Sequence, residues 1–448
     1  MSYATTNSCH TMQFVNNWGY MDIQIIKDKD VMQIKQLLLR KQRTTKDVTR
    51  SVKEIIKNVQ NNGDVALLKY AKELDNATIN NLKVSEEEIQ YAIKNTQPNF
   101  LNILKKARDN IYDYHINQKR QGYWITDTPG IMLGQKITPI NSIGIYVPSG
   151  KATYPSSVLM GVVPAVIAGV ENIAITTPPQ HDGTVNSDII VAANVSGVHN
   201  IYKVGGAQAI AALAYGTNTI SKVDKIIGPG NIYVATAKKL VYGSVDIDSI
   251  AGPSEVLVIA DETSLPKNIA ADMIAQAEHD EMSQAILITT SPHIAQATQK
   301  ELNLQLNTLP KADIAKKALK ETSAIIITED IVKACEISNA IAPEHLEIMT
   351  NEPLALLPYI TNAGSIFLGH YSPEALGDYF AGTNHILPTM GTARFSSGVS
   401  VDDFVKKSSV LYYDKTALEK VSDDIATFAR KEGLEGHARS IEIRLRKP

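Results

Sequence analysis

The chain is poor in cysteine, with only Cys9 and Cys335 among its 448 residues. Two cysteines cannot form a disulfide framework or a zinc site built from thiolates. This scarcity fits a reducing compartment, and we expect a cytoplasmic protein. Cys335 lies within a predicted helix and outside every motif described below, so it is a weak candidate for a catalytic nucleophile.

An excess of one charge and a long apolar run are also missing. The chain has 44 Lys and Arg against 47 Asp and Glu, whereas nucleic-acid or membrane-surface binding needs a clustered positive field. The longest apolar stretch, residues 158–170, contains a proline and two glycines and is shorter than the ~20 residues that span a bilayer. Residues 1–20 contain no Lys, Arg, Asp or Glu, so they do not resemble a signal peptide. We expect neither a nucleic acid nor a membrane as a partner.

What the chain does contain is an alternation of short β-rich runs with helical segments, beginning near Asn141. This alternation predicts an α/β fold with parallel sheets. The strands expected in the first half are 142–147, 173–177, 201–204 and 225–227, and those in the second half are 256–260, 285–289, 324–327, 346–349 and 365–368. Two such units suggest two facing Rossmann-like halves, with a ligand between them near the carboxyl ends of the strands.

The remaining segments complete the expected organisation. We expect a loosely ordered extension (1–20), a mainly helical N-terminal region packed on the α/β core (21–137), the two open parallel-sheet halves (138–250 and 251–370) and a C-terminal segment (371–448). Strand signals fade beyond Tyr371, and the chain ends in a charged segment with helical character, residues 418–446. This extended tail is a candidate for docking to a partner.

Neither half contains the Gly-x-Gly-x-x-Gly fingerprint of many dinucleotide-binding proteins. Two other glycine turns follow predicted strands and open predicted helices, Gly205-Gly206 and Gly228-Pro-Gly-Asn231. Free backbone amides at such a junction suit a phosphate or a ribose hydroxyl. Glycine is needed equally often for a tight turn alone, so both interpretations remain open.

Several polar residues could hold a metal ion. Gln276 and His279 are three residues apart in a predicted helix over 266–279, so they would share a face, and zinc accepts nitrogen and oxygen donors. A lone helical histidine is more often structural. Asp378, His385 and His437 lie in glycine-flanked segments further along the chain, as is typical of side chains that project from turns.

Glu344 and His345 place a carboxylate beside an imidazole at a helix-to-strand junction. Histidine titrates near neutral pH and can take a proton from an alcohol, while a glutamate can activate water. Considered alone, the pair could equally be a solvated glutamate beside a partly buried histidine.

Taken together, six motifs resemble the histidinol dehydrogenase family over residues 30–448. They begin at Ile247 (IDxxAGPSE), Ala275 (AQAEH), Ala342 (APEHL), Gly377 (GDYxxGTNH), Gly391 (GTARFSS) and Glu432 (EGLxxH). The resemblance implies a zinc- and NAD-dependent homodimer, with one zinc per subunit, that oxidises L-histidinol to L-histidine, the last step of histidine biosynthesis. Two NAD molecules would be consumed in sequence.

The resemblance also implies roles for individual residues. Glu344 and His345 would be catalytic, with His345 as the general base and Glu344 activating water. The implied zinc ligands are Gln276, His279, Asp378 and His437. The implied NAD contacts are Tyr146, Gln208 and Asn231. Substrate contacts would come from Ser254, His385 and Glu432 together with His345 and the zinc ligands. The C-terminal tail would be exchanged, so that Glu432 and His437 complete the site of the other subunit.

Two other functions remain as alternatives. A zinc hydrolase would use Glu344 as its base while the metal polarises a carbonyl, but it leaves the two glycine turns unexplained. A dinucleotide-binding protein without catalytic activity would need Gln208 and Asn231 but not Glu344 or His345.

Overall fold

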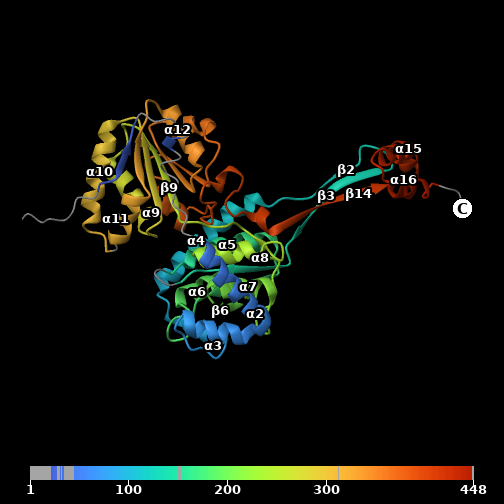
Figure 1. Cartoon of the computed structure of the whole chain (residues 1–448), viewed down its shortest axis with the longest axis horizontal. Helices are drawn as coiled ribbons and strands as arrows, with labels where there is room; N and C mark the ends of the chain where they lie inside the picture. The colour runs from blue at the N-terminus through green and yellow to red at the C-terminus, as the bar shows by residue number, and fades with distance from the viewer. Residues whose placement is uncertain are drawn as a thin grey trace, which may run out of the picture.

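The computed structural model describes residues 22–27, 31, 33–34, 45–149, 153–310 and 312–445. Figure 1 shows two lobes side by side and a long arm that leaves them and ends in two helices. The extension expected over residues 1–20 lies outside the described residues. Within the described part of the chain, no helix combines the length and the apolar character needed to cross a membrane.

The first lobe is built on a five-stranded parallel sheet in the order β6-β5-β4-β7-β8. Its strands are β4 (Ser142–Tyr146), β5 (Asn172–Thr177), β6 (Ile201–Lys203), β7 (Lys225–Ile227) and β8 (Asp246–Ile247). Successive strand residues face opposite sides, and helices bury both faces. One face packs on α3 (Glu86–Asn95), α4 (Pro98–His115), α5 (Pro155–Ala168) and α6 (Ser187–Val195). The other packs on α2 (Thr45–Leu74), α7 (Gly206–Tyr215) and α8 (Ile232–Val241).

The second lobe contains a six-stranded parallel sheet in the order β1-β11-β10-β9-β12-β13. Its strands are β1 (Gln24–Ile26), β9 (Glu255–Ala260), β10 (Gln284–Thr289), β11 (Ala324–Ile327), β12 (His345–Met349) and β13 (Ser365–Leu368). The central strands are buried along their whole length, as expected where helices cover both faces. One face carries α9 (Pro266–Ala277), α10 (Pro292–Leu306) and α11 (Ala312–Glu321). The other carries α12 (Ile331–Ile341) and α13 (Pro353–Leu356).

The arm is an antiparallel sheet in the order β14-β3-β2, formed by β2 (Tyr123–Ile125), β3 (Ile131–Pro139) and β14 (Val405–Tyr413). It leads to α15 (Lys415–Lys431) and α16 (Glu435–Glu442), which pack on each other through Ala426, Ala429 and Ala438. Figure 1 places these two helices at the tip of the arm, away from both lobes.

The predicted α/β fold with two parallel-sheet halves is confirmed, and three details differ. Strand signals fade beyond Tyr371, yet the chain forms the nine-residue strand β14 there. The segment expected to be mainly helical contributes β1 to the second sheet and both β2 and β3 to the arm. Helix α9 ends at Ala277 rather than at residue 279.

Candidate functional site

Glu344 and His345 are both held by the backbone of one residue on the adjacent strand. Helix α12 ends at Ile341, and the left-handed conformation of its C-cap, Ala342 (φ 56°), turns the chain into β12. The Glu344 carboxylate accepts a hydrogen bond from the N–H of Glu255 (2.9 Å). His345 Nδ1 lies 2.9 Å from the carbonyl oxygen of Glu255. The predicted catalytic pair therefore lies at the junction of β9 and β12, and both side chains are buried.

These contacts determine which nitrogen of His345 carries the proton. A carbonyl oxygen only accepts hydrogen bonds, so Nδ1 must be the donor. Nε2 is buried without a hydrogen-bond partner and lies 3.9 Å from Oδ1 of Asp378. Burial lowers the pKa of His345, against an opposing effect of Asp378. The neutral imidazole thus presents an unprotonated Nε2, as a general base requires.

Oxygen and nitrogen donors surround Nε2 of His345. Helix α14 (Glu374–Tyr379) contributes Asp378 and Glu374, and ligand atoms of these two residues and His345 all lie within 4.8 Å of one another. His385 lies beside them: Nδ1 donates to the carbonyl of Asp378 (3.1 Å), and Nε2 is 3.1 Å from the hydroxyl of Ser157. This arrangement of donors can bind a divalent cation.

Gln276 and His279 reach the same region from α9. Gln276 is fully buried near the end of the helix, whereas His279 lies beyond that end and is exposed. The expectation that they share a helical face is therefore wrong, because the helix stops before His279. Burial is the main cause of the lowered pKa values of His345 and His385, and His279 adds a smaller electrostatic effect to both, so His279 lies close to this group. Ser254, half-buried, directly precedes β9.

Glu432 and His437 are not near the other predicted site residues of the same chain. Glu432 is the C-cap of α15 and His437 lies in α16, and both residues are exposed. Figure 1 shows these helices at the tip of the arm, whereas α9 and β9 belong to the second lobe. One chain by itself thus brings together only part of the predicted site.

The three residues predicted to contact a dinucleotide lie at the carboxyl edge of the first sheet. Tyr146 ends β4, and its hydroxyl accepts a hydrogen bond from the N–H of Gly206 (3.2 Å). Gln208 is buried in α7, and its Oε1 lacks a hydrogen-bond partner. Asn231 caps α8 by accepting hydrogen bonds from the N–H groups of Tyr233 and Val234 (3.0 and 3.2 Å). Burial raises the pKa of Tyr146 to about 12, so its phenol is a neutral hydrogen-bonding group.

Both glycine turns have the tight geometry that glycine permits. Gly206 and Gly228 adopt positive φ angles of 63° and 116°, and a side chain at Gly228 would collide with the carbonyl oxygen of Tyr146. The turns therefore approach Tyr146 closely.

The candidate residues lie at opposite edges of the two sheets, at the carboxyl ends of the strands in the first and at the amino ends in the second. In the first sheet these residues follow the strands, as expected for an open α/β sheet. In the second sheet, Ser254 precedes β9, Glu344 precedes β12 and His345 is its first residue. In the second lobe, these candidate residues therefore lie at the amino edge of the sheet, and not after the strands as expected.

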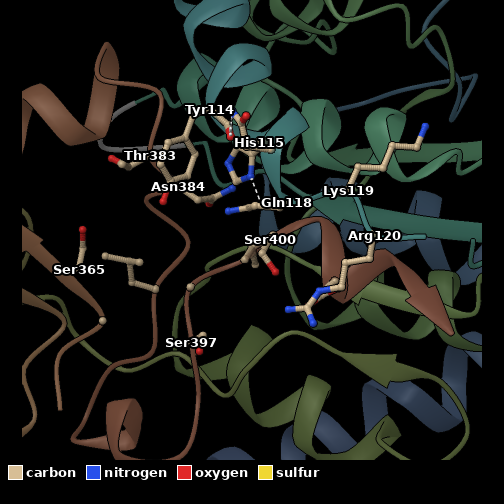
Figure 2. A pocket seen from close by; sticks show the side chains of 16 residues that line it. Tyr114, His115, Gln118, Lys119, Arg120, Ser365, Thr383, Asn384, Ser397 and Ser400 are labelled. Atoms are coloured by element: carbon tan, nitrogen blue, oxygen red, sulfur yellow. Dashed lines mark hydrogen bonds and ion pairs between the residues drawn. The ribbon is translucent and has the colours of Figure 1, made fainter. Parts of the chain in front are cut away.

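A polar cavity of about 510 Å³ lies next to the amino edge of the second sheet. Figure 2 shows His115, Gln118 and Arg120 on one side of it and Ser365 on the other. Ser365 pairs with His345 between β13 and β12, but none of the predicted site residues lines the cavity.

Comparison with known proteins decides between the alternatives. The family model described as histidinol dehydrogenase matches residues 38–445. The chain belongs to the histidinol dehydrogenase family. Membership makes it an NAD-dependent oxidoreductase that acts on an alcohol, and not a hydrolase or a binding protein without activity.

The similarity to known relatives extends over almost the whole length of both chains. The chain is 56% identical to histidinol dehydrogenase from Geobacillus kaustophilus over 90% of this chain and 95% of the relative. It is 53% identical to histidinol dehydrogenase from Clostridium acetobutylicum over 95% of this chain and 99% of the relative. The crystal structure of histidinol dehydrogenase from Elizabethkingia anophelis superposes with a TM-score of 0.91 at 41% identity and covers 94% of this chain and 98% of that one.

The sequence reasoning missed Glu374. Its side chain is buried, and its carboxylate lies 3.8 Å from Nδ1 of His345. Burial raises the pKa of Glu374 well above its usual range, and the nearby carboxylates of Asp378 and Glu347 add to the effect. One signal was present in the sequence: Glu374 precedes Asp378 by four residues, and this spacing puts both on one face of a helix.

Proposed function

We propose that the chain oxidises L-histidinol to L-histidine in two successive NAD-dependent steps, with the aldehyde as the intermediate. The observation that carries this proposal is the fixed tautomer of His345, whose Nε2 is unprotonated and faces Asp378. A buried neutral imidazole next to a carboxylate is suited to remove the proton of an alcohol.

In the first step, Nε2 of His345 takes the hydroxyl proton of the substrate. The carbonyl of Glu255 stabilises the resulting imidazolium, because Nδ1–H already donates to it. NAD would accept the hydride in both steps, and a zinc ion held by Gln276, His279, Asp378 and His437 would anchor the substrate. Because Glu344 and His345 are buried, the aldehyde is shielded from bulk water, and the one water that reacts with it is the water that Glu344 activates.

Before the second step, His345 passes the alcohol proton to solvent and becomes neutral again. Glu344 then takes a proton from the water that adds to the aldehyde, and His345 acts as base on the hydrate. The proposed route needs no cysteine. Cys335 is buried in α12, and burial raises the pKa of its thiol. It is thus a poor nucleophile, which disfavours a thiohemiacetal route.

We propose Gln276, His279, Asp378 and His437 as the ligands of one zinc ion per subunit. One feature of the structure fits a metal here: the carboxylates of Glu374 and Asp378 lie close together beside His345, without a lysine or arginine partner among the described residues. The charge of a divalent cation would offset the repulsion between these carboxylates. Held by these four residues, zinc would anchor and orient the substrate as a template rather than activate a water molecule.

We propose that His437 and Glu432 reach this site from a second copy of the chain. The arm and its helices expose large apolar side chains, among them Trp124 (53%), Leu411 (71%) and Phe428 (68%). Exposed apolar surface of this kind marks an interface. A two-fold dimer with exchanged arms would bury it and complete both sites.

We further propose that Ser254, His385 and Glu432 contact the substrate and that Tyr146, Gln208 and Asn231 contact NAD. The unsatisfied Oε1 of Gln208 and the tight turns beside Tyr146 support the cofactor assignment. The residue ranges 138–250 and 251–370 are proposed as the two main domains, with 21–137 and 371–448 as the flanking regions.

The test is to supply the zinc-loaded protein with L-histidinol and NAD and to identify the product by mass spectrometry. The proposal expects L-histidine, with no free aldehyde captured by a trapping amine. Release of the aldehyde as the end product, or no NAD-dependent product, contradicts it.

A further inference from the structure

The side-chain amide of Gln276 has one orientation that satisfies its surroundings. In that orientation, Nε2 donates to both carboxylate oxygens of Glu374, at 2.9 and 2.8 Å. Because the two ends of an amide point in different directions, the carbonyl oxygen of Gln276 is then turned away from Glu374. Gln276 is fully buried, so water cannot compensate for a reversed amide.

Glu374 is itself fixed in place. Its N–H donates to Oε1 of Glu347 (2.7 Å), and the side chain of Glu347 is hydrogen-bonded to that of Asp272. Asp272 and Gln276 lie four residues apart on α9. The network therefore connects α9, β12 and α14 and returns to the helix that carries Gln276.

This network costs stability, since buried carboxylates are expensive without a cation. In the described part of the chain, neither Glu374 nor Glu347 forms an ion pair with lysine or arginine. Arrangements that sacrifice stability are typical of functional sites. None of the steps assigned to His345 and Glu344 uses these three carboxyl groups.

We propose that Glu374 is a positioning residue, which fixes the amide of Gln276 so that its carbonyl oxygen is presented to the metal, and that Glu374 is not itself a ligand. The inference rests on the proposed function, in which Gln276 is a zinc ligand. The competing assignment places Glu374 on the metal directly, because its carboxylate lies near the donor atoms of His345 and Asp378.

A double-mutant cycle on zinc affinity separates the two assignments. The dissociation constant is measured by competition with a chromogenic chelator for the full-length wild-type protein, Gln276→Ala, Glu374→Gln and the double variant. A glutamine at 374 offers both a donor and an acceptor, so it no longer dictates the orientation of the amide. We expect Glu374→Gln to weaken zinc binding about 10- to 100-fold. We expect no further loss when Gln276→Ala is already present, because the two residues act through one interaction.

Additive losses in the double variant would overturn the proposal in favour of direct ligation by Glu374. Unchanged affinity in Glu374→Gln, with a loss in Gln276→Ala, would also overturn it while leaving the proposed function intact. If Gln276→Ala binds zinc as the wild type does, the ligand set of the proposed function has failed instead.

Two further variants serve as a charge control and as a test of rescue. Glu278→Gln removes the same charge from an exposed position next to His279, and its affinity should stay within about threefold of the wild type. The exchange Gln276→Glu with Glu374→Gln rebuilds the hydrogen bond in the reverse sense and should recover affinity lost in Glu374→Gln. It also carries the test if Glu374→Gln alone does not fold, and failure to recover affinity counts against the proposal.

Discussion

His345 donates its Nδ1 proton to the backbone carbonyl of Glu255 over 2.9 Å. The contact joins two adjacent parallel strands, since His345 is the first residue of β12 and Glu255 the first of β9. Because the acceptor belongs to the backbone, no side-chain substitution removes it. The tautomer of the His345 imidazole, the proposed general base, is thus set by the register of the sheet.

Replacing His345 by asparagine should separate this hydrogen bond from the base. The asparagine amide can still donate to the carbonyl of Glu255, but it offers no basic nitrogen in place of Nε2. We expect kcat to fall by about 10²- to 10⁴-fold, while NAD binding measured by calorimetry is unchanged.

A matched control is His115→Asn. His115 is another fully buried histidine, seen in Figure 2, and its Nδ1 pairs with Gln118. Folded His115→Asn protein should keep its turnover. Full turnover in His345→Asn would remove the assignment of the general base.

Asp75 should make stability depend on pH in a predictable direction. Burial raises the pKa of its carboxyl from 3.8 to about 6, so the folded state binds this proton more tightly than the unfolded state. The contribution of Asp75 to the free energy of unfolding therefore becomes less favourable to the folded state as the pH rises from about 4 through about 6. Asp75→Asn should stabilise the protein at pH 8 by about 1–2 kcal/mol, after allowance for partial exposure.

The measurement is the thermal midpoint of Asp75→Asn relative to the wild type at pH 8 and at pH 4. The gain should be clear at pH 8 and should shrink toward pH 4. Asp113→Asn, at an exposed position on α4, should change stability by less than about 0.5 kcal/mol at either pH. An equal gain at both pH values in Asp75→Asn would refute the role of its ionisation.

Removal of zinc should abolish turnover without abolishing cofactor binding. The proposed ligands Gln276 and Asp378 belong to the second lobe, whereas Tyr146 and Gln208 belong to the first. Protein stripped by a chelator should therefore bind NAD in calorimetry but produce no NADH. Adding zinc should restore activity, and full activity after stripping would contradict the metal assignment.

Mixing two inactive variants tests the exchanged arm. Variants carrying His437→Asn or His345→Asn should each be inactive, for loss of a ligand and of the base respectively. In a mixed dimer, one site receives both changes and the other receives neither. After subunit exchange at equal amounts, we expect about a quarter of the wild-type activity, as a two-fold symmetric dimer requires. No recovery, with mixed dimers demonstrated by mass spectrometry, would rule out the exchange.

Sequence periodicity predicted both parallel sheets because their strands are buried on both faces, which gives apolar runs such as Glu255–Ala260. It could not predict β14, since most of that strand is exposed and its Lys406-Lys407-Ser408-Ser409 segment carries no apolar stripe. Its pairing with β3 depends on residues more than 260 positions away along the chain. Strand β1 was missed because three residues are too few to show a pattern.

The site was predicted in parts. Glu344 and His345 are adjacent in the sequence, so their proximity required no knowledge of the fold. That Glu255 supplies the backbone partners of both is a consequence of strand pairing, which a single sequence does not reveal. The usual rule for open α/β sheets placed the candidate residues after the strands, whereas those of the second lobe lie at the amino edge of its sheet.

The number of NADH molecules formed per L-histidinol consumed tests the central claim most directly. The zinc-loaded protein is given a limiting amount of L-histidinol and an excess of NAD, and absorbance is followed to completion. Two oxidations by one base, His345, with hydration assisted by Glu344, predict two NADH per L-histidinol. One NADH per substrate, with the aldehyde as product, would contradict this account.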